Sequence, residues 1–197
     1  MFRNFRGARQ PNHGLDQKLK SLEQQAQIAL PGFDAQFYNR AGDLCVEADD
    51  RPRALTYYGQ AIDAYLRARR YNAAGAVCRK LLRISPSAVR ARCTLAWLSI
   101  GKLLLGDARR EIGEYAEAAK LAGQERLARK QLAMMAETAR DAELRELLAV
   151  LLEDLGDGET AGRVRAAEPP DPDDDLDAYW DGVLRAALMG PEELGAG

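Results

Sequence analysis

The chain has 197 residues, a net charge of −2 and 47% hydrophobic residues, enough apolar surface for one continuous core. Its only histidine, His13, excludes a histidine-based catalytic triad and a metal site with several histidines. No run of about 18 apolar residues occurs, and no apolar segment of signal-peptide length follows the first arginines, so we expect no membrane span and a cytoplasmic location.

Three segments between residues 1 and 156 differ in amino-acid composition. Residues 1–14 mix arginines with glycine and proline, which predicts a disordered basic arm. The next segment, 15–30, places leucines at steps of three and four and predicts an amphipathic helix that ends at Pro31 and Gly32. From residue 33 to 156 glycine and proline are scarce, and alanine, leucine, arginine and glutamate dominate. This composition predicts an all-helical fold.

Seven further helices are expected at even spacing. Their predicted ranges are 34–48, 52–69, 71–84, 87–104, 107–121, 124–138 and 141–155. Residues suited to helix starts mark the joints, with Asp50, Ser87, Asp107 and Asp141 as caps and Pro52 in a first turn. Because the joints are short, successive helices must lie antiparallel and side by side.

Alanines near the helix starts recur with a fixed spacing to larger residues. The two clearest sets are Ala54, Tyr58 and Ala61, and Ala74, Cys78, Leu81 and Pro86. An alanine lets the neighbouring helix approach closely, and the residues four and seven positions later fill the remaining space. Units of this kind bury their apolar sides only by stacking on one another.

This pattern resembles the tetratricopeptide repeat, a helix-turn-helix unit of about 34 residues. The matching positions are Tyr38, Ala41, Gly42, Ala54, Tyr58 and Ala61 in one phase, Tyr58, Ala61, Tyr65, Ala74, Cys78, Leu81 and Pro86 in an overlapping phase, and Leu95, Ala96, Ala108 and Ile112 in the next unit. The phase of the repeat stays open, and residues 124–156 keep the helical period with almost none of the signature. The resemblance implies an all-α fold of antiparallel helix-turn-helix repeats stacked as a short α-solenoid over residues 15–156.

The resemblance also implies a function, because the first helices of such repeats line a groove that takes a peptide or a helix of a partner protein. With 55–68 and 89–102 as those helices, the expected partner-binding residues are Asp63, Arg67, Arg90, Cys93 and Trp97. Trp97 has the ring and N–H of an interface anchor, but a tryptophan in the middle of TLAWLSI is more often a core residue. The lysine-asparagine set by which some relatives clamp a C-terminal carboxylate is not present. The groove that the resemblance implies predicts that the chain is an adaptor or scaffold.

No catalytic residue, cofactor or metal ligand is predicted, and the chain is expected not to be an enzyme. A phosphate-cradling glycine loop and a calcium-binding loop are both missing, and runs of adjacent acids are typical of solvated surface. Cys45, Cys78 and Cys93 stand in apolar helical surroundings. We expect them to be small buried residues without disulfides.

Two alternative functions follow from other features. Eight cations within 26 residues could follow nucleic-acid phosphates: Arg67, Arg69, Arg70, Arg79, Lys80, Arg83, Arg90 and Arg92. The helix dipole also favours cations near helix ends, and a pI of about 5.6 weighs against duplex binding. The other alternative is a permanent structural subunit of a larger complex, in which exposed helical surfaces are covered.

The last part of the chain is strongly acidic. After residue 156, eleven carboxylates stand against three arginines, a net charge of −8. Residues 157–175 predict an acidic linker, and 176–190 predict an amphipathic helix. The predicted anchors of this helix are Leu176, Tyr179, Trp180, Val183, Leu184 and Leu188. Since so short a helix has marginal stability in water, we expect it to dock, either on its own repeats or on a partner. On its own repeats it would either shield the basic groove or only cap the C-terminal end of the solenoid.

Overall fold

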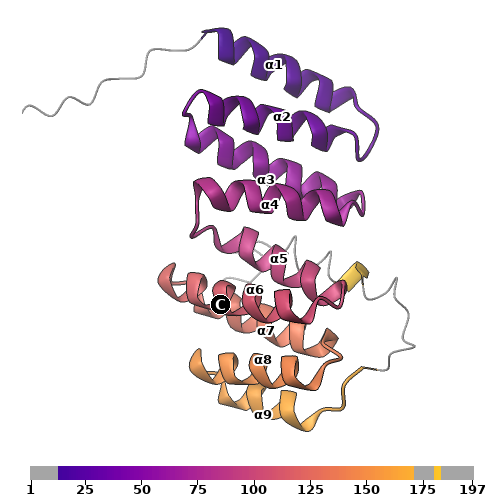
Figure 1. Ribbon diagram of the computed structural model, residues 1–197, viewed down its shortest axis with the longest axis vertical. Coiled ribbons are helices and arrows are strands. Elements are labelled where there is room, and N and C mark those ends of the chain that lie inside the picture. The colour runs from indigo at the N-terminus through magenta and orange to yellow at the C-terminus, as the bar shows by residue number, and fades with distance from the viewer. Residues whose placement is uncertain (1–12, 171–179, 183–197) are drawn as a thin grey trace, which may run out of the picture.

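The computed structural model describes residues 13–170 and 180–182, and helices are the only regular secondary structure in these residues. The helices are α1 (His13–Ile28), α2 (Asp34–Glu47), α3 (Arg51–Arg67), α4 (Tyr71–Ile84), α5 (Val89–Gly101), α6 (Leu105–Leu121), α7 (Glu125–Thr138), α8 (Ala142–Asp154) and α9 (Gly158–Ala166). They stack in chain order as antiparallel neighbours along one elongated body (Figure 1). The predicted all-α solenoid is confirmed.

The periodic pattern located the helices well. The seven helices expected between residues 34 and 155 correspond to α2 through α8, with ends that differ by three residues at most. Asp50 and Asp141 cap their helices as predicted, through bonds from the Arg53 and Leu144 amides of 3.4 and 2.8 Å. Ser87 and Asp107 do not cap, because α5 begins after Ala88 and α6 begins after Leu104. None of the described helices is long and apolar enough to cross a membrane.

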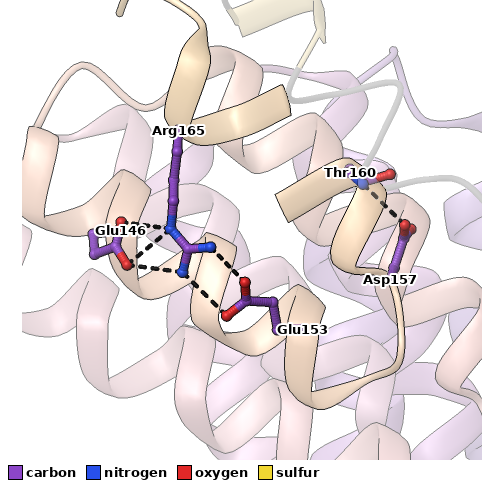
Figure 2. Close-up of polar contacts among 5 residues, drawn as sticks. All are labelled: Glu146, Glu153, Asp157, Thr160 and Arg165. Carbon is purple, nitrogen blue, oxygen red and sulfur yellow. Dashed lines mark hydrogen bonds and ion pairs between the residues drawn. The ribbon is translucent and has the colours of Figure 1, made fainter. Parts of the chain in front are cut away.

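Two predicted boundaries are wrong. His13 and Gly14, assigned to the basic arm, belong to α1. Residues 158–166, assigned to the acidic linker, form α9, which packs on α8. The Asp157 side chain accepts a 3.1 Å bond from the Thr160 amide and begins this helix (Figure 2). Residues 158–166 therefore do not belong to a linker.

An arginine holds α9 against α8. Arg165 donates to both oxygens of Glu146 at 2.9–3.1 Å and to both oxygens of Glu153 at 2.5 and 3.1 Å (Figure 2). Behind this pair of contacts, Ala161 and Val164 are buried. A second arginine, Arg145, is buried and donates to the carbonyl oxygens of Ala136, Val164 and Ala167. These bonds satisfy carbonyls that the ends of α7 and α9 leave without helical partners.

Pairs of small buried residues, twelve positions apart, mark three successive close helix contacts. The pairs are Gly42 with Ala54, Ala96 with Ala108, and Ala149 with Ala161. They lie in α2 and α3, α5 and α6, and α8 and α9, and recur after 54 and 53 residues. This pairing of small residues therefore recurs at every third helix.

The antiparallel stack has two edges, each formed by alternate joints. We call the joints 29–33, 68–70, 102–104 and 139–141 the tail-side edge. The joints 48–50, 85–88, 122–124 and 155–157 form the opposite edge. The short helical turn 180–182 lies at the tail-side edge, close to the end of α5, on the right in Figure 1.

Candidate functional site

Five of the described helices, α2, α3, α5, α6 and α8, end in the same Schellman turn. One residue in each adopts a left-handed backbone and donates its amide to the carbonyl three residues back, while the next amide reaches five residues back. The left-handed residues and their φ angles are Asp49 at 54°, Arg69 at 55°, Leu103 at 55°, Gly123 at 67° and Gly156 at 81°. This position favours glycine, because a side chain there crowds the following carbonyl.

Among these five left-handed positions, Arg69 and Leu103 carry residue types that the backbone conformation disfavours. Aspartate tolerates the left-handed conformation, whereas arginine and leucine each cost about 1–2 kcal/mol there. Both side chains point outward, Leu103 with 64% of its surface exposed, and both lie in successive joints of the tail-side edge. A strained, exposed residue that the fold does not require suggests that its side chain has a function.

The joint 68–70 is tied to the joint before it. Arg70 donates to the Gly32 carbonyl at 3.3 Å, and its guanidinium lies 6.0 Å from the ring centre of Phe33 and 5.8 Å from that of Tyr65. The backbones approach so closely that a Cβ atom on Gly32 would lie 2.8 Å from Cβ of Ala68. Arg70 therefore connects the joint 68–70 to the joint 29–33 and fixes the position of the neighbouring Arg69.

Two adjacent residues of the C-terminal segment contact this joint. The Trp180 ring stacks on Tyr71, with 4.2 Å between ring centres and 17° between planes. Asp181 accepts a 2.7 Å bond from Arg69, in an ion pair whose side chains are about half exposed. Such a stack contributes about 0.5–1.5 kcal/mol and such an ion pair about 0–1 kcal/mol. The contact is specific in geometry and weak in energy.

An apolar hollow of about 310 Å³ opens at the next two joints, 102–104 and 139–141. Its lining includes Ile100, Leu103, Leu105, Leu144, Arg140 and Asp141. Leu104, beside it, is 48% exposed. The hollow is of a size that takes one or two apolar side chains.

Lys102 connects the hollow with the Tyr71 contact. Its ammonium donates to Asn72 Oδ1 at 2.7 Å, and its neighbours Gly101 and Leu103 line the hollow. Partial burial, and then the charge of Arg79, lowers the pKa of Lys102. The aromatic contact, the lysine and the hollow therefore form one continuous surface along the tail-side edge.

The predicted groove residues do not form one site. Asp63 and Arg90 meet in an ion pair at 2.6 and 3.3 Å between α3 and α5, and Arg67 is exposed one turn further along α3. Cys93 and Trp97 are 7% and 1% exposed. Both are therefore buried within the stack, where α5 is enclosed by its neighbours and Trp97 donates to Gln131 of α7, as the core interpretation of Trp97 expects.

The cysteines are buried free thiols, as predicted. Burial raises the pKa of Cys45 and raises those of Cys78 and Cys93 to about 12. Thiols with such a pKa stay protonated at neutral pH and are poor nucleophiles. Among the described residues no group of three or more histidine, cysteine, aspartate or glutamate side chains is arranged to hold a metal ion.

Half of the predicted basic cluster is bound to carboxylates of the chain itself. These ion pairs are Arg69 with Asp181, Lys80 with Asp43, Arg90 with Asp63, and Arg92 with Glu114. A nucleic-acid phosphate would have to replace each carboxylate, so the pairs lower the charge that the cluster presents to a polyanion.

Sequence reasoning missed the tail-side surface, although a signal was present. Glycine ends the Schellman turns at 123 and 156, so the arginine and leucine at the matching positions 69 and 103 are anomalies visible in the sequence once the turns are aligned. Of the predicted tail anchors the structure places Trp180. The other five, Leu176, Tyr179, Val183, Leu184 and Leu188, lie outside the described residues.

Comparisons with protein-family models, curated proteins and solved structures gave no match to this chain. The tetratricopeptide resemblance therefore stays a prediction from the sequence pattern.

Proposed function

We propose that this protein is a tetratricopeptide-like adaptor that holds a short segment of another protein along its tail-side edge. The observation that supports the proposal is the pair of strained, outward-pointing residues Arg69 and Leu103 in successive joints. Neither side chain is required by its Schellman turn, and together they supply a cation and an apolar contact. We place the adaptor in the cytoplasm, where its free cysteines suit a reducing compartment.

The composition of the surface fits a protein ligand. Tyr71 offers an aromatic face, Arg69 and Lys102 offer positive charge, and the hollow beside Leu103 offers an apolar seat. Protein interfaces commonly combine an aromatic or apolar anchor with a polar rim in this way. A segment bound from Tyr71 across Lys102 would cover Leu103 and Leu104 from water, which gives the contact a hydrophobic driving force.

Partner capture with matched variants tests this proposal. The full-length chain is cross-linked in native lysate, and the captured proteins are identified for the wild type, Leu103→Gly and Arg69→Gly. Asp49→Gly is the control, since it makes the same backbone change in a Schellman turn of the opposite edge. We expect a partner that the wild type and the control retain and that Leu103→Gly loses. Equal retention by all four proteins would contradict the proposal.

A permanent structural subunit is the second candidate, supported by exposed apolar residues elsewhere. Ile28, Leu30 and Phe33 are 86%, 73% and 54% exposed around the first joint, and Leu121 is 81% exposed on the opposite side of the stack. Exposed apolar groups of this kind are covered in obligate complexes. Light scattering of the isolated chain separates the two: an adaptor stays monodisperse without its partner, whereas a subunit deprived of its complex self-associates.

A further inference from the structure

We propose that the ligand of the tail-side edge carries an aromatic residue followed directly by an acidic one, and that Trp180 and Asp181 of the chain itself occupy this place as an intramolecular competitor. This inference rests on the proposed function and names its ligand class and its regulation. The basis is the simultaneous contact of Trp180 with Tyr71 and of Asp181 with Arg69.

The two contacts define a recognition pattern. Arg69 lies in the joint 68–70 and Tyr71 begins α4, and these two residues contact two consecutive residues of the tail. The stack selects a flat aromatic ring, and the guanidinium selects a carboxylate beside it. Arg70 and Lys102 lie on the same surface and add positive charge, so an acidic surrounding sequence is favoured. The eleven carboxylates after residue 156 give the chain's own tail this character.

The contact of Trp180 and Asp181 with the edge is weak enough for a partner segment to displace it. Arg69 and Asp181 keep 48% and 51% of their side-chain surfaces exposed, so water and salt screen the ion pair. Thirteen residues join α9 to Trp180, and such a short connection raises the effective concentration of the tail to the millimolar range. A partner segment that presents the same pair and also fills the hollow beside Leu103 makes more contacts than these tail residues and displaces them.

A labelled peptide tests the inference with the full-length chain and without any partner. The probe is the sequence of residues 176–190, LDAYWDGVLRAALMG, with a fluorophore at its N-terminus, and its binding is followed by anisotropy. Two proteins are compared, the wild type and the double variant Trp180→Ala/Asp181→Ala, whose own tail has lost both contacts. We expect the double variant to bind the peptide at least about twofold more tightly than the wild type, the smallest effect that loss of the stack and the ion pair would give.

A charge exchange tests whether binding occurs at the proposed place. Adding Arg69→Glu to the double variant should weaken peptide binding tenfold or more, and a peptide with lysine at the position of Asp181 should restore it. Asp49→Gly, on the opposite edge, should leave peptide binding unchanged.

Three outcomes overturn the inference. One is equal affinity of the wild type and the double variant, the second is no binding up to millimolar peptide, and the third is binding that does not respond to Arg69→Glu. If the double variant also unfolds more easily and binds no peptide, the tail is a cap of the stack. Because this experiment contains no partner and the capture experiment contains no peptide, the failure of one leaves the other interpretable.

Discussion

The indole nitrogen of Trp97 donates a 2.8 Å hydrogen bond to Oε1 of Gln131, 34 residues further along the chain, and so joins α5 to α7. Both side chains are buried, with 1% and 2% of their surfaces exposed. A polar contact in an apolar interior is satisfied in one geometry only, so it fixes the register of the two helices. The largest fully buried side chain of the stack thus has a structural role.

Trp97→Ala should lower the free energy of unfolding by about 3–5 kcal/mol, because it leaves a large cavity at the centre of the stack. Trp97→Phe should cost less, since most of the apolar volume is kept and the hydrogen bond is lost. Trp180→Ala is the matched control and should change stability by no more than about 1.5 kcal/mol, the worth of its stack on Tyr71. Chemical denaturation measures all three. Equal effects of the Trp97 and Trp180 replacements would contradict the burial of Trp97.

Leu103→Gly should stabilise the fold by about 1 kcal/mol, and Arg69→Gly should gain less, because it also loses the ion pair with Asp181. The left-handed backbone costs a leucine or an arginine about 1–2 kcal/mol, and the greater freedom of glycine in the unfolded chain offsets part of that gain. Asp49→Gly should gain less, because aspartate tolerates this conformation. The midpoints of urea denaturation report these differences. A loss of stability on Leu103→Gly would mean that Leu103 contributes more to packing than its 64% exposure indicates.

The helices were predictable from local patterns, and the candidate site was not. Apolar spacing and caps such as Asp50 and Asp141 depend on residues within one or two turns, so they can be read without the fold. The burial of Trp97 depends on Gln131, 34 residues away, and the anomaly at Leu103 emerges only when the Schellman turns of distant joints are aligned. Neither is contained in a short window of sequence.

The missed helix α9 illustrates the same limit. Its sequence, GETAGRVRA, has two glycines and few apolar residues, so composition favours a linker. The contacts that stabilise it come from α8 and α7, through Arg145 and the carboxylates that Arg165 meets. Tertiary contacts override weak local propensity here.

Gly42→Ala should destabilise the fold by about 1–3 kcal/mol. A Cβ atom at this position would lie 2.5 Å from the ring of Tyr58, so the ring or α2 must move. The ring has little freedom to do so, because the Tyr58 hydroxyl donates to Asp43 at 2.8 Å. Gly59→Ala in α3 is the matched control. No atom lies within 4 Å of its added Cβ, so this change should raise stability by about 0.5–1 kcal/mol. Thermal melting of the two variants should therefore give shifts of opposite sign, and a shared sign would contradict the close contact of α2 with α3.

The packing of α9 should depend on pH through Arg165. Its hydrogen bonds lower the pKa values of Glu146 and Glu153 in the folded chain (Figure 2). A carboxylate with a lowered folded pKa stabilises the fold fully above its unfolded pKa of about 4.3 and loses this effect as the pH falls through its folded pKa. Hydrogen exchange of the α9 amides should therefore speed up, relative to the amides of α5, as the pH falls from about 5 to 3.

Arg165→Gln should remove most of this pH dependence, because neither carboxylate then loses a charged partner on protonation. Arg163→Gln is the control in the same helix, since Arg163 donates to the Thr160 hydroxyl at 2.9 Å, and it should keep the wild-type dependence. Normalising each α9 amide to an α5 amide of the same sample removes the intrinsic acid dependence of exchange. If Arg165→Gln and Arg163→Gln gave the same profile, the acid release of α9 would have to come from groups other than Glu146 and Glu153.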